Sequence, residues 1–182
     1  MSEAAYLALE AEAETRHEYV NGEMVAMSGG TPAHAAIAAN LARALGNRLI
    51  DRPCLVLSSD ARVNVDATGP YPDLTIVCDP PRFAPKSPIT LGNPTVLIEV
   101  LSDSTEAYDR GAKFAHYRHL DSLQSYLLVA QAPRRVEHFQ RMPGGRWLLT
   151  VVEDGDVEIP CLGFALPLDE IYLKLDLLAP PG

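Results

Sequence analysis

One carboxylate interrupts an otherwise apolar run that reads Val-Leu-Ile-Glu-Val-Leu, residues 96–101. On a central strand the side chain of Glu99 loses its water, and a buried carboxylate must find a partner or take up a proton. An ion pair with an arginine, or a hydrogen bond to the neutral acid, would satisfy it without any chemistry. A divalent cation would satisfy it too, and other residues must decide between these interpretations.

A second acid, Asp73, opens another apolar run, residues 72–78, directly after a proline. It can cap its own turn, which is a common use of aspartate after proline. If its strand lies beside the strand of Glu99, two carboxylates from neighbouring elements meet, and Mg²⁺ prefers oxygen ligands of this kind. The pair therefore suggests a site for Mg²⁺ or Mn²⁺.

Lys113 follows Asp109 by four residues, so the two share one face of the helix predicted after the strand of Glu99. A solvent-exposed ion pair of this kind contributes only about 0.3–0.5 kcal/mol. If the helix instead packs back over the sheet, the ammonium lies beside Glu99. There it could orient an attacking water or stabilise charge that develops on a phosphoryl group.

Two N-terminal residues complete the candidate site. Glu18 lies in a predicted hairpin and is either a solvated strand residue or an additional ligand. His34 lies in the first turn of a long predicted helix and is either a hydrogen-bonded structural histidine or a base near the scissile phosphate. The candidate catalytic residues are Asp73, Glu99, Lys113, His34 and Glu18, with Asp73 and Glu99 as the metal ligands.

Local patterns predict the elements that must position these side chains. Helices are predicted over 2–13, 31–49, 104–119 and 168–173, with Thr31 and Asp103 as caps. Asn21-Gly22 predicts the turn of a hairpin over 17–27. Further strands are predicted over 54–58, 61–65, 73–78, 95–101, 124–130, 134–141 and 146–152. Five prolines predict little regular structure in 79–94.

The sequence predicts a single α/β domain over residues 1–182, with a mixed sheet flanked by helices and an antiparallel C-terminal meander. The net charge of −9 disfavours non-specific coating of nucleic acid, although metal-binding carboxylates push the charge the same way. Cys54, Cys78 and Cys161 lack CxxC spacing, which argues against a disulfide framework or a zinc site. An acidic N-terminus and the lack of a long apolar run predict a cytoplasmic protein without a membrane span.

These motifs resemble the Uma2 family, also called DUF820, of restriction-endonuclease-like proteins in the PD-(D/E)XK superfamily. The resemblance covers nearly the whole chain, through the stretches 16–41, 58–65, 71–79 and 94–129 and the terminal "LDEIYLKLDL". It implies that Asp73 and Glu99 stand for the Asp and the (D/E) of the motif. Leu101 occupies the position of the lysine, which implies that Lys113 is a migrated substitute.

Two functions of different classes follow. The first is a Mg²⁺- or Mn²⁺-dependent endonuclease that hydrolyses phosphodiester bonds of DNA. The alternative is a catalytically inactive nuclease-like domain that serves nucleic-acid binding or protein assembly, which Leu101 and the acidic charge favour. Exposed strand edges within 124–152 would in either case favour a homodimer.

Overall fold

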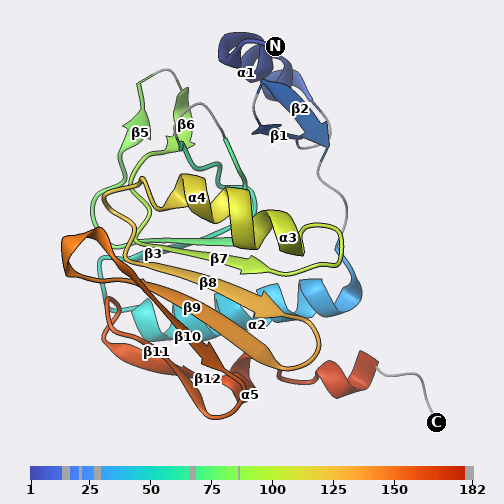
Figure 1. Ribbon diagram of the computed structural model, residues 1–182, viewed down its shortest axis with the longest axis vertical. Helices are drawn as coiled ribbons and strands as arrows, with labels where there is room; N and C mark the ends of the chain where they lie inside the picture. Colours follow the sequence, from blue (N-terminus) through green and yellow to red (C-terminus); the bar gives the residue numbers. More distant parts are fainter. Residues whose placement is uncertain (14–16, 21, 27–29, 66–68, 86, 179–182) are drawn as a thin grey trace.

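A six-stranded mixed sheet lies at the centre of the molecule (Figure 1). The computed structural model describes residues 1–13, 17–20, 22–26, 30–65, 69–85 and 87–178. Across the sheet the strands are β10 (Trp147–Val152), β9 (Arg135–Arg141), β8 (Ser125–Ala130), β7 (Val96–Val100), β4 (Leu74–Val77) and β3 (Leu55–Ser58). Within this sheet β7 and β8 run parallel, and the other neighbouring strands run antiparallel. The predicted mixed sheet and antiparallel meander are confirmed.

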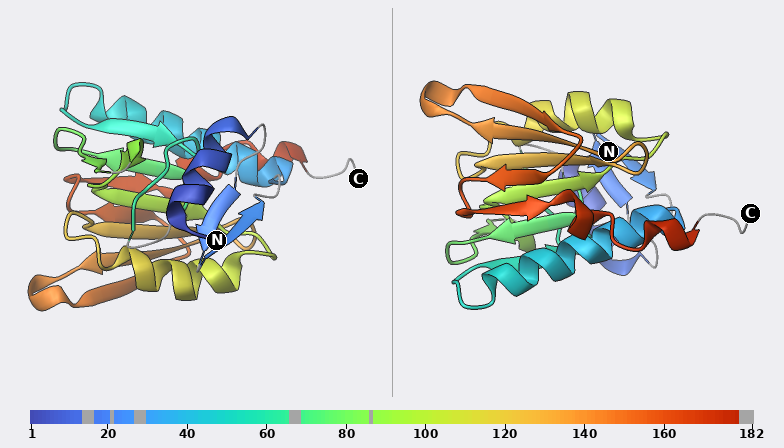
Figure 2. Two further views of the ribbon diagram at one scale, coloured as in Figure 1. Left: turned by 90° about the horizontal axis from the view of Figure 1, so that it is seen from above. Right: turned by 90° about the horizontal axis from the view of Figure 1, so that it is seen from below.

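Helices cover both faces of the sheet, as Figure 2 shows. The helices are α1 (Glu3–Glu12), α2 (Pro32–Leu49), α3 (Glu106–Tyr108), α4 (Phe114–Tyr117) and α5 (Leu168–Ile171). A five-residue π-helical stretch, Asp109–Lys113, joins α3 to α4 in one continuous helical segment. In the described part of the chain, no helix has the length and apolarity to cross a membrane.

Each face of the sheet has its own apolar core. Ile37, Leu41 and Leu45 of α2 are fully buried against one face, as their spacing predicted. On the other face Tyr117 of α4 packs in a cluster that includes Leu97 of β7. The helical segment of residues 106–117 is therefore held against the sheet beside Glu99.

Three pairs of short strands stand outside the central sheet. They are β1 (His17–Val20) with β2 (Glu23–Ala26), β5 (Phe83–Ala84) with β6 (Ser87–Leu91), and β11 (Asp156–Ile159) with β12 (Phe164–Pro167). The first pair confirms the predicted hairpin, although Asn21 of its turn lies outside the described residues. The pair β5–β6 corrects the prediction for 79–94, because the prolines of this segment do not prevent a short antiparallel pair. The sequence did not predict β11 and β12.

Two further predictions about secondary structure were wrong. Residues 61–65 do not form a strand, and Val63 makes only an isolated parallel bridge with Leu91. Val63 and Val65 alternate with polar residues because both valines are buried in a core. Asp103 does not cap the helical segment, because Thr105 occupies the position before α3 and makes no capping hydrogen bond through its side chain.

The interpretation of the cysteines was also wrong, because Cys54 and Cys78 form a disulfide. The antiparallel register of β3 and β4 pairs Leu55 with Val77, and the same register places the two cysteines opposite each other at the next position. Sequence spacing alone does not show such cross-strand proximity. Cys161 is the free cysteine of the described chain.

Candidate metal and phosphate site

Asp73 and Glu99 lie across from each other on neighbouring strands. The antiparallel register pairs Leu74 of β4 with Ile98 of β7, and one step further along the same register places Asp73 opposite Glu99. Directly opposed residues of an antiparallel pair point to the same face, with Cβ atoms about 4.5–5.5 Å apart. The strand pairing thus brings together the two carboxylates that the sequence singled out.

Glu99 is anchored through one carboxylate oxygen. The Lys113 ammonium lies 2.9 Å from Oε1, and the Tyr117 hydroxyl donates to the same oxygen at 3.0 Å. Lys113 and Tyr117 are four residues apart on the helical segment, so both reach the sheet from one face of it. Among the described residues, no hydrogen bond engages Oε2.

Asp73 is likewise held through one oxygen of its carboxylate. Its Oδ2 accepts the backbone N–H of Val100 at 2.7 Å, and His34 Nε2 lies 3.2 Å from the same atom. The first contact ties the start of β4 to the end of β7. Among the described residues, no hydrogen bond engages Oδ1 of Asp73, and the same is true of Oε2 of Glu99.

His34 reaches Asp73 from the first turn of α2. Thr31 caps this helix by accepting the N–H of His34 at 3.1 Å, and Pro32 follows at the first helical position. Gly30 leaves room for the imidazole, because a Cβ there would lie 2.8 Å from its Nδ1. The hydrogen bond to Asp73 raises the pKa of His34 above its ordinary value, although burial opposes the rise.

Lys113 lies among three carboxylates. Besides Glu99, its ammonium lies 3.3 Å from Glu18 Oε1 and 3.4 Å from Asp109 Oδ1. Burial alone would lower the pKa of Lys113, but the surrounding carboxylates outweigh burial and raise it. Because Lys113 and Asp109 are buried, the structure excludes the simple surface ion pair that their spacing allowed. π-Helical turns of this kind recur at functional sites.

Glu18 comes from β1, outside the central sheet. Its Oε1 accepts the backbone N–H of Tyr71 at 3.2 Å in addition to contacting Lys113. Its side chain is 14% exposed, so it is not the solvated strand residue that remained an alternative. The N-terminal hairpin is therefore part of the site.

Negative charge exceeds positive charge in this cluster. Burial raises the pKa of the Glu99 carboxyl well above its ordinary value, and it raises the pKa of Asp109 as well. Lys113 opposes both rises, but Lys113 and His34 together supply at most two positive charges, whereas Glu18, Asp73, Glu99 and Asp109 supply four carboxylates. The cluster would therefore gain stability from a further cation.

The donor set fits a hard divalent cation. Mg²⁺ is usually held by one or two carboxylates, and waters and phosphate oxygens complete its shell. Oδ1 of Asp73 and Oε2 of Glu99 can supply those two ligands. Within the described ranges, no three His, Cys, Asp or Glu side chains converge as a ready-made metal cage. Such an ion would therefore depend on water and substrate for its remaining ligands.

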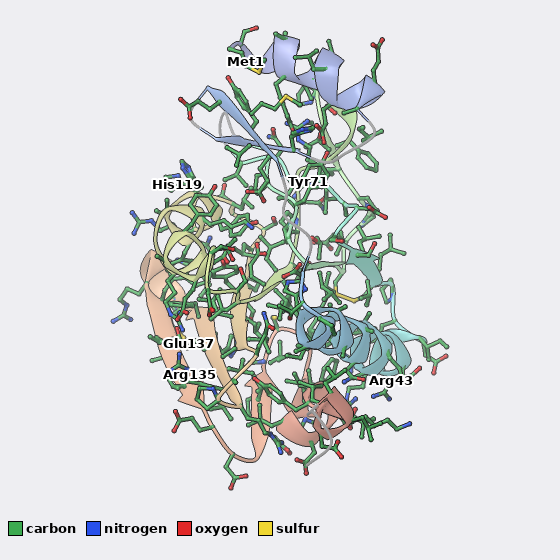
Figure 3. All side chains as sticks on the ribbon, turned by 90° about the vertical axis from the view of Figure 1, so that its right-hand side faces the viewer. Met1, Arg43, Tyr71, His119, Arg135 and Glu137 are labelled. Carbon is green, nitrogen blue, oxygen red and sulfur yellow. A yellow bond between two sulfur atoms is a disulfide. The ribbon has the colours of Figure 1, made fainter. Side chains whose placement is uncertain are left out.

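A pocket of about 770 Å³ opens over these groups. All five candidate residues line it, together with Asp109 and Leu101. Tyr71 and Arg135 also line the pocket. Both are labelled in Figure 3, which views the molecule from the right-hand side of Figure 1. The volume is within the usual range for small-molecule sites, so a phosphate group with flanking atoms can enter.

Sequence reasoning missed two polar groups of the site. Tyr117 was not a candidate, although its position four residues after Lys113 would have placed it on the same helical face. The N–H of Val100 was also missed, because a backbone donor carries no sequence signal. Leu101 is buried at the edge of the pocket, so the position of the motif lysine is filled by an apolar side chain.

A family model and two relatives match most of the chain. The Uma2 model, described as "Putative restriction endonuclease", matches residues 4–169. In Synechocystis sp. (strain ATCC 27184 / PCC 6803 / Kazusa), "Uncharacterized protein slr1290" is 35% identical over 178 residues, which cover 96% of this chain and 93% of that protein. "Uncharacterized protein sll1609" from the same organism is 34% identical over 161 residues, which cover 87% and 91%.

A solved structure has a similar fold. It is the crystal structure of "a putative nuclease belonging to DUF820 from Anabaena variabilis ATCC 29413", with a TM-score of 0.77 and 17% sequence identity. The match covers 94% of this chain and 97% of that chain. The nuclease-like fold expected from the sequence is therefore confirmed.

Proposed function

Because the chain belongs to the Uma2 family of restriction-endonuclease-like proteins, we propose that it is a divalent-metal-dependent endonuclease that hydrolyses phosphodiester bonds of DNA. The observation that carries the proposal is the pair Asp73 and Glu99. Asp73, one residue before β4, lies opposite Glu99 of β7. Each is anchored through one oxygen, and each keeps a second oxygen for a cation. The fold alone would not distinguish this function from others.

Mg²⁺ or Mn²⁺ is the proposed cofactor, with Asp73 Oδ1 and Glu99 Oε2 as its protein ligands. When bound, such an ion polarises a phosphate oxygen and lowers the pKa of a coordinated water. Tyr117 and Lys113 hold Glu99 in place, so its second oxygen keeps a fixed direction. This preorganisation is supplied by buried groups and survives the entry of a substrate.

Lys113 supplies positive charge beside the scissile phosphate in this proposal. Its ammonium stays protonated at neutral pH, because the surrounding carboxylates raise its pKa. A buried cation stabilises charge on a phosphoryl group more strongly than one in water. In this proposal Lys113 has the role of the superfamily lysine, because Leu101 occupies the position of that lysine.

His34 and Glu18 take supporting parts. His34 can donate its Nε2–H to Asp73, which lies within hydrogen-bonding distance, and can accept or return a proton at its other ring nitrogen, Nδ1. Glu18 connects Lys113 to the backbone of Tyr71 and fixes the ammonium from the side of the N-terminal hairpin. DNA as substrate and a cytoplasmic location belong to the same proposal.

Cleavage of supercoiled plasmid in Mg²⁺ or Mn²⁺ tests the proposal. We expect the wild type to produce nicked or linear DNA, Glu99→Gln to lose this activity, and the exposed Glu158→Gln to retain it. Chelation of the metal should stop the reaction. A wild type that binds plasmid without cutting it would instead support the inactive nucleic-acid-binding alternative, which Leu101 and the acidic charge favour.

A further inference from the structure

Among the described residues, β10, the outermost strand of the central sheet, has no strand paired along its outer edge (Figure 2). Natural edge strands are usually short, charged, bulged or interrupted by proline, and these features prevent pairing with other chains. β10 has none of them, since it reads Trp-Leu-Leu-Thr-Val-Val and pairs with β9 over six consecutive positions. Leu148, Leu149 and Val151 of this strand are 48%, 47% and 51% exposed.

The backbone of β10 offers hydrogen bonds along this edge. Met142 donates its N–H to the carbonyl of Arg146 at 2.8 Å, so Arg146 turns its backbone toward the β9 side. Successive residues of an antiparallel strand alternate in this direction. Trp147, Leu149 and Val151 therefore direct their N–H and C=O groups outward, where another strand can meet them.

We propose that β10 pairs antiparallel with β10 of a second copy of this chain, so that two central sheets join into one. Pairing centred on Thr150 sets Leu149 opposite the partner's Val151, and both residues direct their backbone groups outward. The same register sets Leu148 opposite the partner's Val152. A twofold axis at Thr150 repeats each contact, as in most homodimers.

Charge explains why the partner is a second copy in this orientation. Arg146 precedes the apolar run, and Glu153 and Asp154 follow it. Antiparallel pairing centred on Thr150 brings Arg146, just before β10, toward the partner's Asp154 in the bend after β10, at both ends of the joint strand pair. A parallel arrangement would instead place like charges side by side, which is unfavourable. This inference goes beyond the proposed nuclease function and does not rest on it.

Sedimentation equilibrium over a range of concentrations tests the inference on the full chain. We expect the mass to rise from the monomer value of 19.8 kDa toward twice that value as concentration increases. Leu149→Lys puts a charge on the joining edge and should leave a monomer. Ile50→Lys is the control, because Ile50 is 77% exposed and lies outside β10, and it should still dimerise.

A charge reversal tests the register. Arg146→Glu and Asp154→Arg should each weaken dimerisation by about five- to thirtyfold, because each removes two exposed ion pairs from the dimer. The double variant restores both pairs in reversed order and should recover dimerisation. A wild type that stays monomeric overturns the inference. A dimer that persists in the Leu149→Lys variant also overturns the inference. The same holds if the chain stays monomeric and β10 pairs only with an unrelated chain.

Discussion

Lys113→Met should destabilise the protein strongly at neutral pH and only slightly in mild acid. The ammonium lies 2.9, 3.3 and 3.4 Å from three carboxylates, and methionine preserves its length without its charge. Removing one partner of a buried ion pair typically costs about 3–5 kcal/mol. The folded variant can limit this cost by taking up a proton on Glu99, whose pKa is already raised by burial.

The cost of that proton sets the magnitude. Protonating a carboxylate with an ordinary pKa of about 4.3 costs about 3.7 kcal/mol at pH 7 and about 1 kcal/mol at pH 5. A chain of this length loses about 2–4 °C of melting temperature per kcal/mol. We therefore expect Lys113→Met to melt about 7–15 °C below the wild type at pH 7, and only about 2–4 °C below it at pH 5.

The sign follows from proton linkage. In the variant the folded state binds a proton that the unfolded state releases above pH 4 to 5, so its stability falls as the pH rises. Thermal unfolding followed by circular dichroism at both pH values measures the difference. Arg43→Met, which removes an exposed cation from α2, is the matched control and should change little at either pH. A Lys113→Met variant that melts with the wild type at pH 7, or whose deficit is the same at pH 5, would refute the reasoning.

Three further predictions follow from the same contacts. Tyr117→Phe removes the hydroxyl that anchors Glu99 and should weaken Mn²⁺ binding by about 10–100-fold in calorimetry, whereas a merely structural hydroxyl would leave affinity unchanged. Gly30→Ala should push the His34 imidazole away from the Asp73 carboxylate, so the pKa of His34 in an NMR titration should fall toward its ordinary value. Gly46→Ala is the control, because Gly46 has open space around it, and it should leave the pKa of His34 unchanged. Burial lowers the pKa of His138 to about 4, so this histidine binds a proton first in the unfolded state as pH falls from about 6.5. Its contribution to wild-type stability should therefore drop by up to about 3 kcal/mol down to pH 4. Urea unfolding of His138→Gln should show a smaller drop, and an equal drop would contradict this assignment.

The sequence singled out five candidate residues that the fold brings into one pocket, but it did not predict their contacts. The carboxylate of Glu99 was conspicuous because it stood alone in an apolar strand, and the proline before Asp73 marked the start of another. Their convergence depends on the pairing of Leu74 with Ile98, which local patterns do not specify. The resemblance to a family had assigned both carboxylates to one motif, and the strand pairing then placed them opposite each other.

Other features were invisible because they depend on distant segments. Cys54 and Cys78 became partners only through the register of β3 and β4. Val63 was mistaken for a strand residue because burial in a loop produces the same alternation as pairing in a sheet. The spacing of Asp109 and Lys113 predicted a shared helical face, but not the π-helical turn or the burial that makes the pair part of the site.

Calorimetric titration of Mn²⁺ tests the central claim most directly, namely that Asp73 and Glu99 form a site for a divalent cation. We predict saturable binding by the wild type, loss of that binding in Glu99→Gln and in Asp73→Asn, and full retention in Glu158→Gln. Circular dichroism of the variants must show that they remain folded. Absence of binding by the folded wild type, or binding that survives both substitutions, would contradict the account and leave Glu99 as a buried structural acid.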